Sequence, residues 1–345
     1  MSTAVVWLPF LHNFLIIYAN FDGPFYIIPA KTLYNPQAIE VLGVGLNLSP
    51  EYFAAHLPLY PLFIRVFAPI LGYLKSMLFV NIASTVTLVW LFYFVVKKLN
   101  LSEKPLLLAS IFLFIPRFLI TRSVGAPESL FMLLIFASLY LFEEKKLFWS
   151  AVLGGLAAMC KTPGILLFLA YFLVYLEQFM RTRKFDSKSL YILLIPAGLL
   201  GVFSLYAAQM GDFFAYFHTQ SVVPLLYPFA AFNFDAKWIQ TIWLEDILFY
   251  FALFGFAVVL LKESRQRSFF YFSLVFLVAT TFVQHRDIAR YILPVVPFVL
   301  IAYEKTLTSK KFMYVALLLL PAVYLFVWNF IGHNVAPIGD WSPFI

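Results

Sequence analysis

The stretch MLFVNIASTVTLVWLFYFVV, residues 77–96, carries no charged side chain. It is long enough to cross the hydrocarbon core of a membrane as one helix, and Lys97 and Lys98 follow it directly. Similar apolar runs fill most of the 345 residues, of which 63% are hydrophobic, 20% aromatic and only 12% charged. A soluble domain is about half apolar and about a quarter charged. The composition therefore excludes a water-soluble enzyme, and also a disordered chain, which would need low hydrophobicity.

Hydropathy predicts an all-α polytopic membrane protein with about eleven spanning helices in a single domain, residues 1–345. Each expected span is an apolar run close to the length that a bilayer requires, or somewhat shorter. The expected spans cover residues 4–20, 77–96, 105–120, 129–142, 147–160, 164–180, 190–208, 246–261, 268–283, 291–303 and 312–331.

A further run, residues 57–73, is ambiguous because prolines and Arg65 interrupt it. If this run lies at the membrane surface, most of the 24 Lys and Arg fall on one side, which the positive-inside rule assigns to the cytoplasm. We therefore expect interfacial helices in a long outer connection, about 21–76. A second outer connection covers about 209–245. Because functional residues concentrate in such connections, we expect these two to form the active-site face.

Metal and nucleic-acid chemistry have little support in the sequence. The single cysteine, Cys160, excludes an internal disulfide and a Cys-rich metal site. The chain also lacks an Asp-x-Asp pair, a His-Glu-x-x-His motif and a Gly-rich phosphate loop. We expect no cofactor and no metal site, although a divalent metal stays open. The net charge of +7 comes from basic residues between apolar runs, which does not indicate nucleic-acid binding.

Asp22 lies at the outer end of the first expected span, in the sequence NFDGPFY, residues 20–26. A carboxylate at the membrane surface can take a proton from a sugar hydroxyl as a general base. The structural alternative is a simple turn, since Asp-Gly-Pro is ordinary turn chemistry.

Three further segments place charged residues on the outer side. His56 precedes a helix start with two prolines, and Arg65 lies about two turns into that helix, where a snorkelling arginine is the structural alternative. Arg122 and Glu128 flank a tight loop. The structural alternative for Glu128 is stabilisation by the helix dipole, because it lies in the first turn of the next helix. Lys161 joins two short spans, where it meets a lipid phosphate or simply reaches solvent.

The densest cationic group on the outer side consists of His285, Arg286 and Arg290. The two arginines are four residues apart and share a face if the segment is helical. Guanidinium groups suit phosphate oxygens, and cations on the outer side are not explained as topology signals. This segment is the strongest indication of a phosphate site.

Taken in order, these segments resemble the motifs of membrane glycosyltransferases of the GT-C superfold. The closest resemblance is to the glycosylphosphatidylinositol mannosyltransferase II family and its prokaryotic relatives. The sequence departs from that family at two places. Phe21 and Gly23 flank Asp22, where the family usually has Trp and Ala, and Lys161 stands where the family usually has an arginine. The matching segments are Asp22, His56–Pro61, Ala126–Phe131, Lys161–Gly164 and Arg290–Tyr291.

The resemblance implies a GT-C-like bundle and an inverting transferase that works on the extracytoplasmic face. It would move a hexose, with mannose expected, from a polyprenyl- or dolichyl-phosphate sugar to a hydroxyl of a glycolipid, glycan or protein. The expected membrane is a prokaryotic plasma membrane, or the endoplasmic reticulum in a eukaryote. The implied general base is Asp22, the implied donor-phosphate residues are Arg290, Arg286, His285, Lys161 and Arg65, and the other candidates are Glu128, Arg122 and His56.

Three alternatives remain open. A transporter or flippase for a lipid-linked sugar would share the spans and the phosphate site, but transporters usually show paired repeats around a midplane site, and we find no repeat. An aminosugar transferase acting on lipid A would use a different donor, and such relatives usually carry a C-terminal soluble domain. A noncatalytic scaffold would leave the segment 285–290 without a reason.

Overall fold

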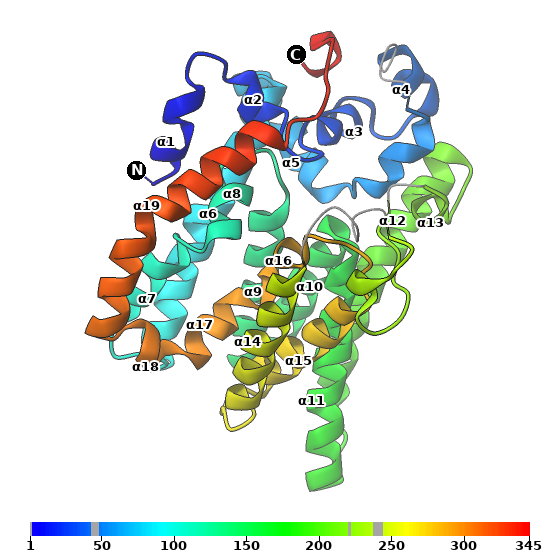
Figure 1. The fold of residues 1–345 in the computed structure, drawn as a ribbon. Coiled ribbons are helices and arrows are strands. Elements are labelled where there is room, and N and C mark those ends of the chain that lie inside the picture. Colours follow the sequence, from blue (N-terminus) through cyan, green and yellow to red (C-terminus); the bar gives the residue numbers. More distant parts are fainter. Residues whose placement is uncertain (1, 43–47, 220–221, 237–243) are drawn as a thin grey trace.

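The structure, a computed structural model, describes residues 2–42, 48–219, 222–236 and 244–345 (Figure 1). Parts of both long connections, residues 43–47, 220–221 and 237–243, lie outside the described residues. The described residues form helices, and the only β pairing among them consists of two isolated bridges. The helices are α1 (Ser2–Trp7), α2 (Leu15–Tyr18), α3 (Ile27–Thr32), α4 (Pro36–Leu42), α5 (Leu59–Leu71), α6 (Tyr73–Lys98), α7 (Pro105–Phe112), α8 (Pro116–Thr121), α9 (Glu128–Glu143), α10 (Leu147–Cys160), α11 (Leu166–Thr182), α12 (Leu194–Met210), α13 (Ala215–His218), α14 (Glu245–Leu261), α15 (Arg267–Thr281), α16 (Ile288–Tyr291), α17 (Val296–Ala302), α18 (Glu304–Leu307) and α19 (Lys310–His333).

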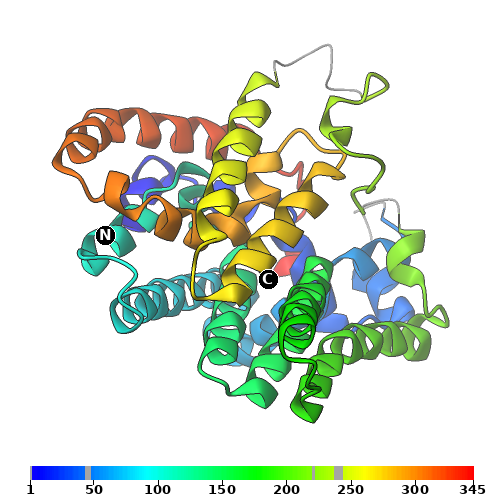
Figure 2. The ribbon, with the colours of Figure 1, turned by 90° about the horizontal axis from the view of Figure 1, so that it is seen from below.

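Four helical segments in the described residues are long and apolar enough to cross a membrane: Tyr73–Lys98, Thr162–Thr182, Ser187–Met210 and Lys310–His333. Shorter apolar helices accompany them, among them α5, α10 and α15. Seen from below, α19 and α12 lie on opposite flanks of the bundle (Figure 2). The predicted membrane protein with several spanning helices is confirmed, with four full-length spans where the sequence predicts about eleven.

Three expected spans are wrong as continuous helices, and proline accounts for the breaks. The expected helix 4–20 ends at Trp7, continues through a turn that contains Pro9, and resumes only at α2. The run 105–120 divides into α7 and α8, with Pro116 at the new start. The run 291–303 divides around Pro294 and Pro297. Proline lacks the N–H that a continuing helix needs and restricts the residue before it.

The first long connection contains the predicted helices. The ambiguous run 57–73 forms α5, and Gly72, whose φ is +77°, separates it from the spanning helix α6. Figure 1 shows α2, α3, α4 and α5 together at the upper end of the bundle. One face of α5 is buried at Ile64, whereas Val66 and Ile70 are 66% and 83% exposed. This two-sided pattern suits a helix at a membrane surface, and that location stays a prediction.

The predicted basic connections meet at the opposite end of the bundle. Lys98 Nζ lies 2.7 Å from Glu144 Oε2, which ties the end of α6 to the end of α9. Lys104 Nζ donates to the carbonyl of Thr308 at 2.9 Å, which joins the start of α7 to α18. Figure 1 shows α18 and the foot of α11 at this lower end. Lys98 and Lys104, two of the residues predicted on the basic side, therefore lie at the end away from α2–α5, and the sidedness of this end stays a prediction.

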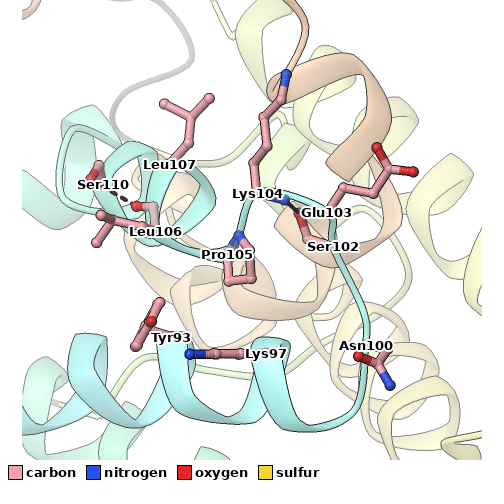
Figure 3. A pocket seen from close by; sticks show the side chains of 10 residues that line it. All are labelled: Tyr93, Lys97, Asn100, Ser102, Glu103, Lys104, Pro105, Leu106, Leu107 and Ser110. Atoms are coloured by element: carbon pink, nitrogen blue, oxygen red, sulfur yellow. Dashed lines mark hydrogen bonds between the residues drawn. The ribbon is translucent and has the colours of Figure 1, made fainter.

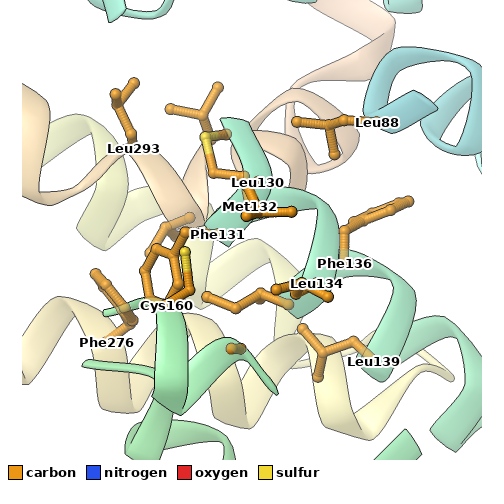
Figure 4. Packing of buried hydrophobic residues seen from close by; sticks show 14 of the residues in the cluster. Leu88, Leu130, Phe131, Met132, Leu134, Phe136, Leu139, Cys160, Phe276 and Leu293 are labelled. Atoms are coloured by element: carbon orange, nitrogen blue, oxygen red, sulfur yellow. The ribbon is translucent and has the colours of Figure 1, made fainter. Parts of the chain in front are cut away.

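Helix α9 forms the centre of the core. It contacts α6, α10 and α15, and Phe131, Met132 and Phe136 are at most 2% exposed. Figure 4 shows these side chains packed with Cys160 of α10 and Phe276 of α15. Because α9 is surrounded on all sides, the residue that begins it, Glu128, is carried into the interior of the protein.

Candidate active site

Glu128 is the centre of the candidate site. Its Oε1 accepts a hydrogen bond from Lys161 Nζ at 2.8 Å and another from Arg290 Nε at 2.8 Å. The Glu128 side chain is only 3% exposed, and its other oxygen, Oε2, is buried with no hydrogen-bond partner among the described residues. Three sequence motifs that lie far apart in the chain thus converge. Two cations and one carboxylate leave the cluster one net positive charge.

Local structure fixes the two cations. Lys161 is extended between α10 and the turn Thr162–Ile165, with φ −148° and ψ 137°. Arg290 lies in the one-turn helix α16, whose N-cap Asp287 accepts the backbone N–H of Arg290 at 3.3 Å. An N-cap carboxylate satisfies a helix donor that would otherwise lack a partner. Both cations therefore come from short turns held against the core.

Arg117 in α8 was not among the residues predicted from the sequence, yet it supports this turn. Its Nη2 lies 3.0 Å from Asp287 Oδ1, and its guanidinium lies 4.4 Å from the ring centroid of Phe330. Nε and Nη1 of Arg117 are buried without a hydrogen-bond partner in the described part of the chain. A charged residue inside an otherwise apolar run is a functional signal, and on that ground the sequence could have identified it.

Asp22 joins the cluster through its neighbour Phe21. Phe21 has a left-handed backbone, with φ +51°, and its ring centroid lies 4.0 Å from Arg290 Cζ. The Asp22 side chain is exposed. Burial would lower the pKa of the Arg290 guanidinium, but the charges of Glu128 and Asp22 raise it above the usual range. The structure therefore brings Asp22 and Arg290 together, as the motif order predicts.

The Asp22 turn packs backbone to backbone on the loop before Glu128. A Cβ at Gly23 would lie 2.6 Å from the carbonyl oxygen of Gly125, closer than real contacts allow. This contact explains why glycine follows Asp22, where the resembled family has alanine. Gly23 sets the spacing between the exposed carboxylate and the buried cluster.

We expect Gly23→Ala to lower the free energy of unfolding by about 1–3 kcal/mol, because the added methyl group forces the two loops apart. The same displacement moves Asp22 away from Arg290. Thermal unfolding of the purified protein in detergent measures the first effect. Gly339→Ala is the matched control, because a Cβ there meets nothing within 4 Å. Equal behaviour of the two variants would contradict this account of Gly23.

His56 lies beside Asp22, in a cage of aromatic rings. Its ring centroid is 4.7 Å from that of Tyr26 and 5.4 Å from that of Tyr52. Burial lowers the pKa of the His56 imidazole, while the charge of Asp22 acts in the opposite direction. His56 Nδ1 is buried with no partner in the described residues. The predicted candidate His56 is thus brought to the same face as Asp22.

Two predicted residues have partners elsewhere. Arg65 donates to the carbonyls of Ala30 and Lys31, at 2.8 and 2.9 Å, at the end of α3. Arg122, which is buried, donates to Thr3 Oγ1 at 2.6 Å and holds α1 against α8. These contacts favour the structural alternative for Arg65 and indicate a structural role for Arg122 as well, because carbonyl and hydroxyl oxygens accept hydrogen bonds from their guanidinium groups.

The remaining candidates lie next to Arg290. His285 Nδ1 accepts the backbone N–H of Asp287 at 2.8 Å, and its ring lies 5.1 Å from that of Tyr291. Arg286 is exposed. Among the described residues, no group of three or more His, Cys, Asp or Glu side chains is placed to hold a metal ion. Phosphate binding by His285 and Arg286 stays a prediction.

Comparisons with known proteins show the fold. No protein-family model and no curated protein matches the chain. The crystal structure of ArnT from Cupriavidus metallidurans bound to undecaprenyl phosphate matches with a TM-score of 0.62 and 13% identity, and the apo state with 0.58 and 12%. Each match covers 96% of this chain and 76% of the ArnT chain. The protein therefore has an ArnT-like GT-C fold, while membership of the glycosylphosphatidylinositol mannosyltransferase II family stays a prediction.

Proposed function

We propose that this protein is a membrane glycosyltransferase that takes a sugar from a polyprenyl-phosphate donor and transfers it to an acceptor hydroxyl. The observation that carries the proposal is the buried Glu128–Arg290–Lys161 cluster next to the exposed Asp22. The fold supports it, because the similar ArnT structure holds undecaprenyl phosphate.

The cluster suits the leaving phosphate. When the bond between the anomeric carbon and the phosphate oxygen breaks, the phosphate keeps the electron pair and gains negative charge. Cations that are already in place stabilise that charge without reorganisation. Glu128 engages only Nε of Arg290, so within the described residues both terminal nitrogens of this guanidinium are left for phosphate oxygens. Glu128 is a positioning residue in this scheme, and Arg290 and Lys161 bind the phosphate.

Asp22 is the general base in the proposed reaction. The acceptor oxygen attacks the anomeric carbon from the face opposite the phosphate, which inverts that centre. The acceptor proton passes to the Asp22 carboxylate as the new C–O bond forms. The exposure of Asp22 favours this role, because an acceptor can approach it from outside the bundle.

We further propose the finer assignments that the motifs imply. The sugar is a hexose, mannose by the motif resemblance, and the acceptor is a glycolipid, glycan or protein. The reaction takes place on the extracytoplasmic face of a prokaryotic plasma membrane, or of the endoplasmic reticulum membrane in a eukaryote. The positive-inside rule supports this sidedness, because the basic connections gather at the end away from Asp22.

A panel of donors tests the function directly. Purified protein in vesicles is incubated with polyprenyl phosphates that carry mannose, glucose or an aminosugar, and the release of polyprenyl phosphate is measured. We expect release from one donor, with mannose the first choice. Movement of the intact lipid-linked sugar across the bilayer without release would support a transporter and contradict the proposal.

We expect Arg290→Ala to raise the KM for the donor by about 10- to 100-fold, because a hydrogen bond to a charged group contributes about 1.5–3 kcal/mol. The KM for the acceptor changes less, since the acceptor meets Asp22. Steady-state kinetics with each substrate varied in turn measure the two effects. Arg265→Ala, an exposed arginine in the connection between α14 and α15, is the control. An equal change in both KM values would argue against phosphate binding by Arg290.

A further inference from the structure

An open hollow of about 700 Å³ lies between the end of α6 and the start of α7 (Figure 3). It is at the basic end of the bundle, since the ion pair of Lys98 with Glu144 lies at the same end of α6. Asp22 and the Glu128 cluster lie toward the other end. Its volume is within the range of about 300–1,000 Å³ that is typical of sites for small ligands. The proposed transfer reaction does not use this hollow.

The lining changes from polar to apolar along the helix axes. Lys97, Ser102 and Lys104 line it at or beside the connection between the two helices, while Tyr93 and Leu106 line it further along α6 and α7. Figure 3 shows Lys97 beside Tyr93, with Leu106 across from them. Because α6 is long and apolar enough to span a membrane, this gradient runs from the membrane surface toward its interior. An amphiphile with its head at the connection matches it.

The charge of the hollow is positive. Lys97 Nζ lies 5.8 Å from the ring centroid of Tyr93, and Lys104 Nζ donates to the carbonyl of Thr308. Among the described residues neither lysine forms an ion pair, in contrast to Lys98, which Glu144 neutralises. Glu103 is exposed on the rim and offsets one of the two charges. Figure 3 shows Lys104 directed away from Lys97, so Lys97 is the ammonium that lies beside Tyr93 in the hollow. The balance favours an anion, and a lysine binds phosphate as a compact point charge.

We propose that this hollow binds the phosphodiester headgroup of an anionic membrane phospholipid. Lys97 contacts the phosphate, Lys104 adds positive charge from the wall, and an acyl chain runs along Tyr93 and Leu106. The apolar wall selects a lipid over a soluble phosphate ion, because burying apolar surface stabilises the acyl chain. The site is separate from the donor site.

Lipid retention tests the proposal. The protein is reconstituted in nanodiscs that contain equal amounts of phosphatidylcholine and phosphatidylglycerol, released, and analysed by native mass spectrometry. We expect preferential retention of phosphatidylglycerol, and about tenfold weaker retention in the double variant Lys97→Gln/Lys104→Gln, the loss of one charged hydrogen bond. The matched control is Lys310→Gln/Lys311→Gln, two exposed lysines at the start of α19, which we expect to retain the lipid.

Other outcomes overturn the proposal. Equal loss in both double variants would show a diffuse attraction of basic residues for anionic lipid. Equal retention of both lipids by the wild-type protein would show that the hollow does not select charge. Displacement of the lipid by millimolar inorganic phosphate would assign the hollow to a soluble anion. Release of polyprenyl phosphate from the donor stays unchanged in the Lys97/Lys104 variant, so failure of this site and failure of the proposed function are distinguishable.

Discussion

The variant Asp22→Asn is expected to lose sugar transfer by about 10²- to 10⁴-fold, the usual contribution of a general base. Asparagine has nearly the same size and shape as aspartate, but its amide cannot accept the acceptor proton at neutral pH. Asp22 is exposed, so the change leaves no buried group without a partner. The fold and donor binding should therefore survive, because Glu128 still holds Arg290 and Lys161.

Two measurements separate this role from a structural one. Thermal unfolding and donor binding should match the wild-type protein, whereas turnover should not. Asp235→Asn, which changes another exposed carboxylate in the second long connection, should keep full turnover. If Asp22→Asn retains most of its activity in vesicles, the base is another group. Loss of donor binding together with turnover would instead indicate that the Asp22 charge orients Arg290.

The convergence of Asp22, Glu128, Lys161 and Arg290 could be predicted from the sequence, because apolar runs and basic connections fix the end of the bundle at which each motif lies. Their grouping follows from topology, without knowledge of packing. The central position of Glu128 could not be predicted in this way. A carboxylate in the first turn of a helix is stabilised by the helix dipole alone, so its sequence position gives no sign of two ion pairs.

The break in the first expected span, residues 4–20, could not be predicted from the local sequence either. Most of its residues are apolar, and a single proline near its start is compatible with a membrane helix. Pro9 interrupts the helix, and tertiary contacts hold the piece before it: Trp328 of α19 donates to the carbonyl of Val5 at 3.3 Å, and Trp7 donates to the carbonyl of Ser123 at 2.8 Å. These partners are more than 100 residues away along the chain, so a local pattern contains no information about them.

The partners of the arginines could not be predicted from the local sequence either. Arg65, Arg122 and Arg290 all lie on the predicted outer side, and only Arg290 belongs to a dense cationic segment. Two of them use backbone or hydroxyl oxygens of a neighbouring segment, and only Arg290 meets a buried carboxylate. Charge patterning singled out the segment that contains Arg290, but which oxygen an arginine reaches is decided by packing.

Glu128→Gln is expected to lower the free energy of unfolding by about 3 kcal/mol, at the low end for breaking a buried ion pair. Arg290 and Lys161 are 16% and 24% exposed, so water screens part of the repulsion between the two cations that are left. Donor turnover should fall by at least about tenfold, because the neutral amide oxygen of glutamine holds the Arg290 guanidinium less firmly than the carboxylate does. Thermal unfolding and the release of polyprenyl phosphate measure the two effects. Wild-type stability and turnover in this variant would contradict the central place of Glu128.

A second substitution tests whether Lys161 only balances the charge of Glu128 or also binds the phosphate. Glu128→Gln/Lys161→Met removes one of the two unpaired cations and should recover part of the lost stability, since residues in one ion-pair network are not additive. Glu128→Gln/Lys184→Met, which removes an exposed lysine after α11, should recover none. If Lys161 also binds the phosphate, turnover in the Lys161 double variant stays low while stability returns. Recovery of both together would mean that Lys161 only balances the charge of Glu128, and that Arg290 alone meets the phosphate.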